Sequence, residues 1–171
     1  MRRSLIPAIA AVALLWPAGT RAQQPQAPAP CATAEHHAFD FWIGTWDVYN
    51  ARGALAGRNV IRAVHGGCAL EEAWSGATGV TGGSLNAWDA ATGVWRQSWV
   101  DSSGLVLELE GGLEGDEMVM TGHVANGDGS RSLHRIRWTP RDDGTVRQHW
   151  QASADDGRTW STLFDGTYRR P

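Results

Sequence analysis

The stretch SLNAWDAATGVWRQSWVD, residues 84–101, decides the fold of this chain. Its centre, Asp-Ala-Ala-Thr-Gly-Val at positions 89–94, has the composition of a four-residue hairpin loop built on a type I turn. Because two antiparallel strands leave that loop, its length fixes which residues face each other. The predicted cross-strand pairs are Asp89–Val94, Trp88–Trp95, Asn86–Gln97 and Ser84–Trp99.

The same pattern of short alternating runs and glycine-rich turns continues on both sides of this hairpin. Period-2 runs of this kind, without a long helical period, indicate an antiparallel meander, and closure removes its exposed edges. We therefore expect an all-β, up-and-down barrel of about 8–10 strands. A short helix over 33–39, with Thr33 as N-cap, precedes it. The predicted strands are 44–51, 57–65, 68–75, 82–89, 94–101, 105–111, 117–125, 132–139, 145–153 and 159–169.

Composition narrows the class of protein further. The chain has 171 residues, 19% charged and 42% hydrophobic, with a net charge of −3, and all its basic side chains except histidine are arginines. Acidic balance without a basic stripe argues against a nucleic-acid partner. The hydrophobic content excludes a disordered chain.

The N-terminus reads as a targeting segment. Arg2 and Arg3 precede an apolar run and a small-residue cleavage site, which predicts a signal peptide over residues 1–22. The ordinary secretory route is favoured over a twin-arginine one. A linker over 23–32 (QQPQAPAP and two further residues) and a single domain over 33–171 follow. We expect a periplasmic or secreted protein without a membrane anchor after cleavage.

Cys31 and Cys68 are the two cysteines of the chain. In an oxidising compartment we expect them to form a disulfide, the alternative being two buried free thiols.

Alternation places polar residues among indoles on one strand face. Leu70, Glu72 and Trp74 share a face, and the next hairpin presents a second such set. Because exposed tryptophans are costly, we assign this face to the barrel interior. The predicted ligand-binding residues are Glu72, Trp74, Asn86, Trp88, Trp95, Gln97, Trp99, Asp101 and Arg147. Alternatively, these polar groups only satisfy one another in a structural layer.

Arg147 belongs to this set only if its side chain points into the barrel. Simple amphipathicity points Arg147 and its neighbours Arg135, Arg137 and His149 outward. The 140–144 turn leaves the register open by one residue, and an inward Arg147 would pair with Glu72 or Asp101, or bind a ligand carboxylate.

No catalytic motif is present in the sequence, so we predict no catalytic residue and no metal site. The favoured function is binding of an unidentified small molecule. Two alternatives stay open: a hydrolase or isomerase using Glu72 and Asp101, and an interaction module with a packed core. Oligomeric state does not follow from the sequence.

The segment FDFWIGTWDV, residues 39–48, contains G-x-W after a short helix and resembles the opening of calycin-type barrels such as lipocalins and nitrobindins. More closely, the chain is similar to a family of uncharacterised exported bacterial proteins, through that segment, GCALEEAW (67–74), WRQSWVDSSG (95–104), VRQHW (146–150) and SADDGRTW (153–160). The resemblance implies a barrel closed at one end by Trp46, and it implies no activity.

No cofactor is expected. A haem bound by His149 is the alternative, but the nitrobindin-like opening G-x-W-x-G-x-G has Val48 and Asn50 at its glycine positions.

Overall fold

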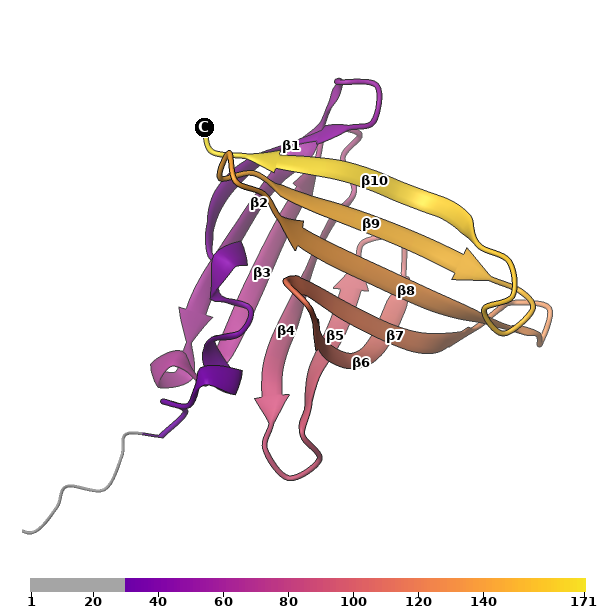
Figure 1. The fold of residues 1–171 in the computed structure, drawn as a ribbon. Helices are drawn as coiled ribbons and strands as arrows, with labels where there is room; N and C mark the ends of the chain where they lie inside the picture. Colours follow the sequence, from indigo (N-terminus) through magenta and orange to yellow (C-terminus); the bar gives the residue numbers. More distant parts are fainter. Residues whose placement is uncertain (1–29) are drawn as a thin grey trace, which may run out of the picture.

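The computed structural model describes residues 30–171. Ten antiparallel strands follow one another around a closed barrel, each hydrogen-bonded to its neighbours in sequence, and β1 pairs with β10 to close it (Figure 1). The predicted all-β meander barrel is therefore confirmed. The strands are β1 (Gly44–Asn50), β2 (Leu55–Val64), β3 (Ala69–Gly76), β4 (Thr81–Asp89), β5 (Val94–Asp101), β6 (Val106–Glu114), β7 (Glu117–Ala125), β8 (Arg131–Pro140), β9 (Val146–Ser153) and β10 (Ser161–Arg169).

The predicted N-terminal helix is present as two short 3₁₀ helices, η1 (Ala34–His37) and η2 (Asp40–Trp42). Their backbone bonds span three residues, as in Trp42 N–H to the Phe39 carbonyl at 3.1 Å. Thr33 occupies the N-cap position, but its hydroxyl bonds the His36 ring instead of a backbone amide. A third 3₁₀ helix, η3 (His65–Gly67), joins β2 to β3.

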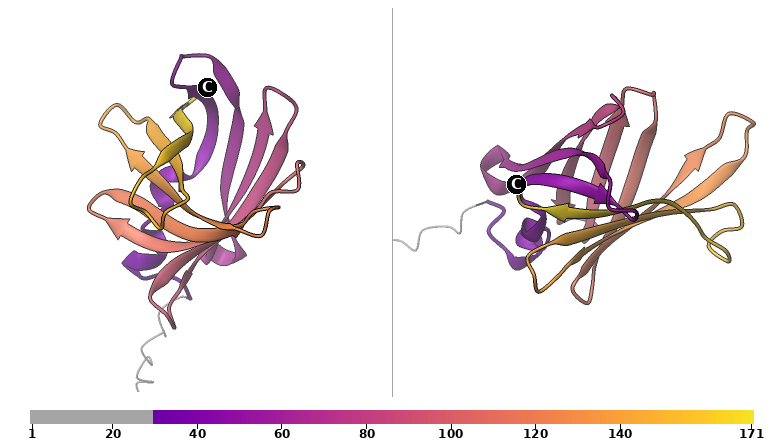
Figure 2. Two further views of the ribbon diagram at one scale, coloured as in Figure 1. Left: turned by 90° about the vertical axis from the view of Figure 1, so that its right-hand side faces the viewer. Right: turned by 90° about the horizontal axis from the view of Figure 1, so that it is seen from above.

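The two ends of the barrel differ. We call the end that carries η1, η2 and the β4–β5, β6–β7 and β8–β9 turns the closed end, and the other the open end (Figures 1 and 2). In the described chain, β6 and β7 pair only from Glu110–Thr121 to Glu114–Glu117, next to the closed end. Beyond these pairs the Gly122 backbone still lies against the Glu108 carbonyl, and the hairpins splay around the open end in Figure 2.

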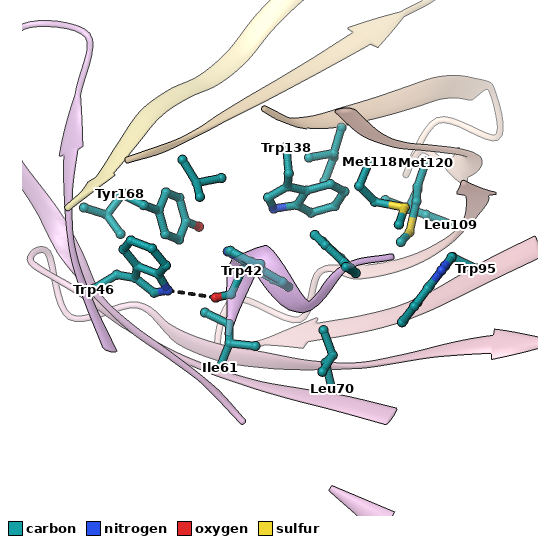
Figure 3. Packing of buried hydrophobic residues seen from close by; sticks show 14 of the residues in the cluster. Trp42, Trp46, Ile61, Leu70, Trp95, Leu109, Met118, Met120, Trp138 and Tyr168 are labelled. Atoms are coloured by element: carbon teal, nitrogen blue, oxygen red, sulfur yellow. Dashed lines mark hydrogen bonds between the residues drawn. The ribbon is translucent and has the colours of Figure 1, made fainter. Parts of the chain in front are cut away.

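Aromatic side chains fill the closed end. Trp42, from η2, stacks on Phe39 with ring centroids 4.8 Å apart and packs against Trp138 of β8 and Tyr168 of β10 (Figure 3). The Trp46 indole N–H donates to the Trp42 carbonyl at 2.8 Å. This half of the barrel is a packed core.

The G-x-W segment explains how β1 starts. Gly44 has φ +146°, and a Cβ there would collide with the guanidinium of Arg170. That guanidinium covers the Trp46 ring at 3.7 Å and donates to the Ile43 carbonyl. Glycine therefore allows Arg170 to lie over the outer side of the tryptophan.

Cys31 and Cys68 form the predicted disulfide, which ties the chain entering η1 to the end of η3. The predicted signal peptide and residues 23–29 of the predicted linker lie outside the described residues. Within residues 30–171, no helix is long and apolar enough to cross a membrane.

Candidate ligand cavity

The predicted inward face is confirmed. The β4–β5 register pairs Trp88 with Trp95, Asn86 with Gln97 and Ser84 with Trp99. Gln97 is 3% exposed, whereas Leu85 and Val100, on the opposite face of the same hairpin, are 48% and 57% exposed. The indoles and amides therefore face the barrel interior, as the alternation predicts.

A belt of hydrogen-bonded polar side chains crosses the interior between the aromatic core and the open end. Gln97 Nε2 donates to Asn86 Oδ1 at 2.7 Å, and Asn86 Nδ2 donates to Ser84 Oγ at 2.8 Å. Ser84 then donates to Glu72 Oε2 at 2.6 Å. The belt links β5 and β4 to the carboxyl of β3.

From the other side, Asn59 of β2 donates to Glu72 Oε1 at 2.7 Å and also to the Tyr168 hydroxyl at 3.2 Å. Tyr168 in turn donates to Gln148 Oε1 of β9 at 2.6 Å. Glu72 thus accepts one hydrogen bond on each oxygen and lies in the middle of the belt.

Glu72 is a buried carboxyl without a positive partner among its contacts in the described chain. Burial raises its pKa to about 7, against the opposing effect of the bonds from Ser84 and Asn59. Burial, and secondarily the charge of Glu72, raises the pKa of Tyr168 well above its usual value. At neutral pH the belt therefore contains a carboxyl poised between its two protonation states.

A cavity of about 60 Å³ adjoins Glu72. Its lining combines the carboxyl with two amides, two indoles and two aliphatic side chains: Glu72, Gln97, Gln148, Trp99, Trp150, Leu107 and Ile136. Trp99 lies two residues before the end of β5, and Trp150 lies in the half of β9 away from the β8–β9 turn, so both are on the open-end side. A water needs roughly 10–15 Å³ of such space, so the cavity has room for a few waters or one small chemical group.

Two predicted tryptophans belong to the closed end. The Trp95 indole is 2% exposed and donates to the Glu35 carbonyl of η1 at 3.0 Å. Trp88 packs beside it against η1, around a groove with Ala34 and Ala38. Sequence alternation gives the correct face for both, but they support the N-terminal cap and do not line the cavity.

Trp74 faces inward near the open end, where its ring covers Gly57 and Gly76. It is not among the residues that line the cavity. Asn86 likewise contributes through the belt, by orienting Gln97 and Ser84, and does not line the cavity itself.

Asp101 is also absent from the cavity lining, which corrects its predicted role. Its Oδ1 accepts bonds from the Ser103 backbone and hydroxyl and from the Leu105 backbone, as an aspartate does when it organises a turn. Despite partial burial, these bonds lower the pKa of Asp101. The alternative in which Glu72 and Asp101 act together at the cavity loses its support, because Asp101 reaches the cavity only through the bond that Trp99 Nε1 donates to its Oδ2 at 3.4 Å.

Arg147 points outward. Its guanidinium makes two bonds to the Asp165 carboxylate of β10, at 2.8 and 2.7 Å. Its neighbours Val146 and Gln148 take the inward positions, which excludes Arg147 from the interior and corrects its place in the predicted set. His149 is outward as well, bonded to Thr162, so it is not placed to hold a haem inside the barrel.

Four cavity residues were missed from the sequence: Leu107, Ile136, Gln148 and Trp150. Gln148 and Trp150 follow from an outward Arg147, because alternation then turns both of them inward. Leu107 and Ile136 carry no such signal, since aliphatic residues fill any barrel interior. Asn59 and Tyr168 of the belt meet only through barrel closure.

No family model matches this chain, and no curated protein shows significant similarity to it.

Proposed function

We propose that this chain is an exported protein that binds a small molecule at the cavity beside Glu72. The observation that carries the proposal is the contrast within one interior: the closed end is filled by aromatic side chains, whereas a cavity with convergent polar groups lies beyond it. Apolar walls with a few placed polar groups are typical of ligand sites. The disulfide supports export, because such bonds persist in oxidising compartments.

The cavity volume limits what enters. Sites for drug-sized ligands measure roughly 300–1,000 Å³, well above the space beside Glu72. We therefore propose that one small polar group of the ligand occupies the cavity, and that the rest of the ligand extends past Trp99 and Trp150 toward the open end. The barrel architecture is compatible with the resemblance to calycin-type binding proteins, which stays a proposal.

A fragment screen on ¹⁵N-labelled full chain tests this function. We expect saturable shifts in the indole N–H resonances of Trp99 and Trp150. Ile136→Phe on β8, or Leu107→Phe on β6, fills the cavity and abolishes those shifts. Val100→Phe, on the outer face of β5, is the matched control and retains them. Absence of saturable shifts in the wild type, or their persistence in both filled variants, contradicts the proposal.

An acid–base enzyme is the second candidate, and the raised pKa of Glu72 is the observation that favours it. Here Glu72 would act without Asp101, which holds the β5–β6 turn. In that case Glu72→Gln loses turnover of a bound compound while retaining its binding. Loss of binding together with turnover instead assigns Glu72 to recognition.

A further inference from the structure

The hydrogen-bond directions in the polar belt leave Glu72 as an acceptor. Ser84 and Asn59 each donate to one carboxyl oxygen. A carboxylate oxygen has room for a second bond, so the carboxyl retains acceptor capacity. Since Glu72 lines the cavity, that remaining capacity is available to whatever occupies it.

No basic side chain supplies the matching charge. The cavity lining and the bonding partners of Glu72 contain no arginine within residues 30–171. On β8 and β9, Arg137 bonds Glu117 and Arg147 bonds Asp165, whereas Arg135 bonds Gln151 and lies over the Trp160 ring; none of the three lines the cavity. A buried carboxylate without a counter-charge is costly, and a positive ligand group would remove that cost.

The one interior histidine near the cavity is held neutral. Trp150 donates its indole N–H to His134 Nδ1 at 3.0 Å, which makes Nδ1 an acceptor. Nε2 then carries the hydrogen and bonds Ser132 at 3.0 Å. Burial also lowers the pKa of His134. His134 therefore does not provide the missing cation.

The remaining lining suits a nitrogen cation. Gln97 donates to Asn86 through Nε2, so its carbonyl oxygen is a second acceptor at the cavity. The Trp99 and Trp150 indoles form part of the wall, and indole faces attract cations. Two acceptors and two indoles favour a group that carries several N–H donors and a positive charge.

We propose that the ligand group bound beside Glu72 is a protonated nitrogen group with several N–H donors, of the amidinium, guanidinium or ammonium class. This inference rests on the small-molecule binding proposed above and specifies its chemistry. The cation pairs with the Glu72 carboxylate, donates to the Gln97 carbonyl and lies against the indoles. A neutral isostere has the same shape but leaves the negative charge of the Glu72 carboxylate without a partner.

Proton release accompanies this binding. Because the cation selects the ionised form of Glu72, its affinity rises with pH through about 7 and then levels. The other ionisable groups facing the interior from the surrounding strands are Tyr168 on β10, His134 on β8 and Asp101 at the end of β5. Tyr168 stays neutral because burial raises its pKa well above its usual value, and Asp101 stays ionised because, despite partial burial, the bonds of its turn lower its pKa. His134 is neutral because its Nδ1 accepts the Trp150 N–H.

The test compares n-butylguanidinium with n-butylurea, its neutral isostere, on the full chain by calorimetry and indole N–H resonances at millimolar concentrations. We expect the guanidinium to bind at least about tenfold more tightly. Heat measured in two buffers of different ionisation enthalpy should report proton release near neutral pH. Glu72→Gln should abolish both the preference and the release. Glu71→Gln, which removes a charge from the outer face of the same strand, should change neither.

The outcomes separate the two proposals. Equal or tighter binding of n-butylurea, or a guanidinium preference that survives Glu72→Gln, overturns the ligand class and leaves small-molecule binding standing. Binding of neither compound, combined with a fragment screen that gives no saturable shifts, overturns both.

Discussion

The closed end and the cavity half of this barrel are built from the same strands and the same residue types, but the first is a packed aromatic core and the second contains the cavity. Trp95 and Trp99 lie four residues apart on β5 and face the same interior. Trp95 is buried under η1, and its indole N–H donates to the backbone carbonyl of Glu35 in that helix. Trp99 is partly exposed and lines the cavity. The face of a strand therefore decides whether a tryptophan is inside, and position along the strand decides whether it packs in the core or lines the cavity.

The polar belt separates these halves. On the closed-end side, Phe39, Trp42 and Trp138 pack ring against ring, although the indole nitrogens of Trp42 and Trp138 have no hydrogen-bond partner in the described chain. On the open-end side of the belt, Glu72, Gln97 and Gln148 line the cavity, and the hydrogen bonds of the belt fix the positions of their side chains. Stability should therefore depend most on the closed end, and binding on the cavity half.

The largest expected effect is on the closed end. Trp42→Ala removes a fully buried indole from the centre of the aromatic core and should reduce the free energy of unfolding by about 3–5 kcal/mol. Urea unfolding followed by circular dichroism measures it. Trp99→Ala is the matched comparison: it should lower stability less and weaken n-butylguanidinium binding more. Equal losses of stability would contradict the division into two halves.

The disulfide should come next. Replacing Cys31 and Cys68 together with serine frees the chain that enters η1, and the chain-entropy model predicts a loss of about 3–4 kcal/mol. Thermal and urea unfolding of the double variant, compared with the oxidised wild type, measure the loss. The cavity lies away from this bond, so the fragment-induced shifts of Trp99 and Trp150 should persist below the unfolding transition. If these shifts disappear, the disulfide at the closed end affects binding at the cavity, which would contradict the division into two halves.

The next prediction concerns the cavity half: the free energy of unfolding should depend on pH through Glu72. Its folded pKa of about 7 exceeds the ordinary value of 4.5, so the folded state binds the proton more tightly than the unfolded state does. Stability from this group is therefore present at low pH and is lost as pH rises from about 4.5 through 7. The loss approaches about 3 kcal/mol at alkaline pH.

Glu72→Gln should remove that loss, leaving stability near the wild-type value at acid pH and raising it at alkaline pH. Urea unfolding at a series of pH values measures the difference. Glu71→Gln, exposed on the outer face of β3, should retain the wild-type profile. A wild-type stability that does not fall across this interval would contradict the assigned burial and its effect on the carboxyl.

Local features of the sequence were sufficient for the fold and for three of the seven residues that line the cavity. The β4–β5 register follows from loop length and alternation, which act between neighbouring residues, and so Glu72, Gln97 and Trp99 were correctly turned inward. The role of Asp101 was also readable in principle, because Asp-Ser-Ser-Gly after a strand is a turn signal. Assigning it to the cavity gave alternation too much weight.

Other parts depend on contacts that no local pattern encodes. The bond between Asn59 and Tyr168 joins residues 109 positions apart and exists only because β1 pairs with β10. Which tryptophans η1 and η2 cover depends on where the N-terminal segment docks. Alternation gives no information on either point.

The smallest expected effect on stability concerns Arg147, which lies on the outer face of β9. Arg147 and Asp165 form a two-bond ion pair on the outer face, with side chains 37% and 29% exposed. Such partly solvated pairs contribute up to about 1 kcal/mol, so Arg147→Gln should lower stability by no more than that. Arg58→Gln, which breaks the exposed pair with Asp47, is the control. Calorimetric titration of Arg147→Gln with n-butylguanidinium should give the wild-type affinity, because the guanidinium of Arg147 does not reach the cavity. A change in that affinity, without a similar change in Arg58→Gln, would mean that the register of β9 permits Arg147 to influence Glu72 from outside the barrel.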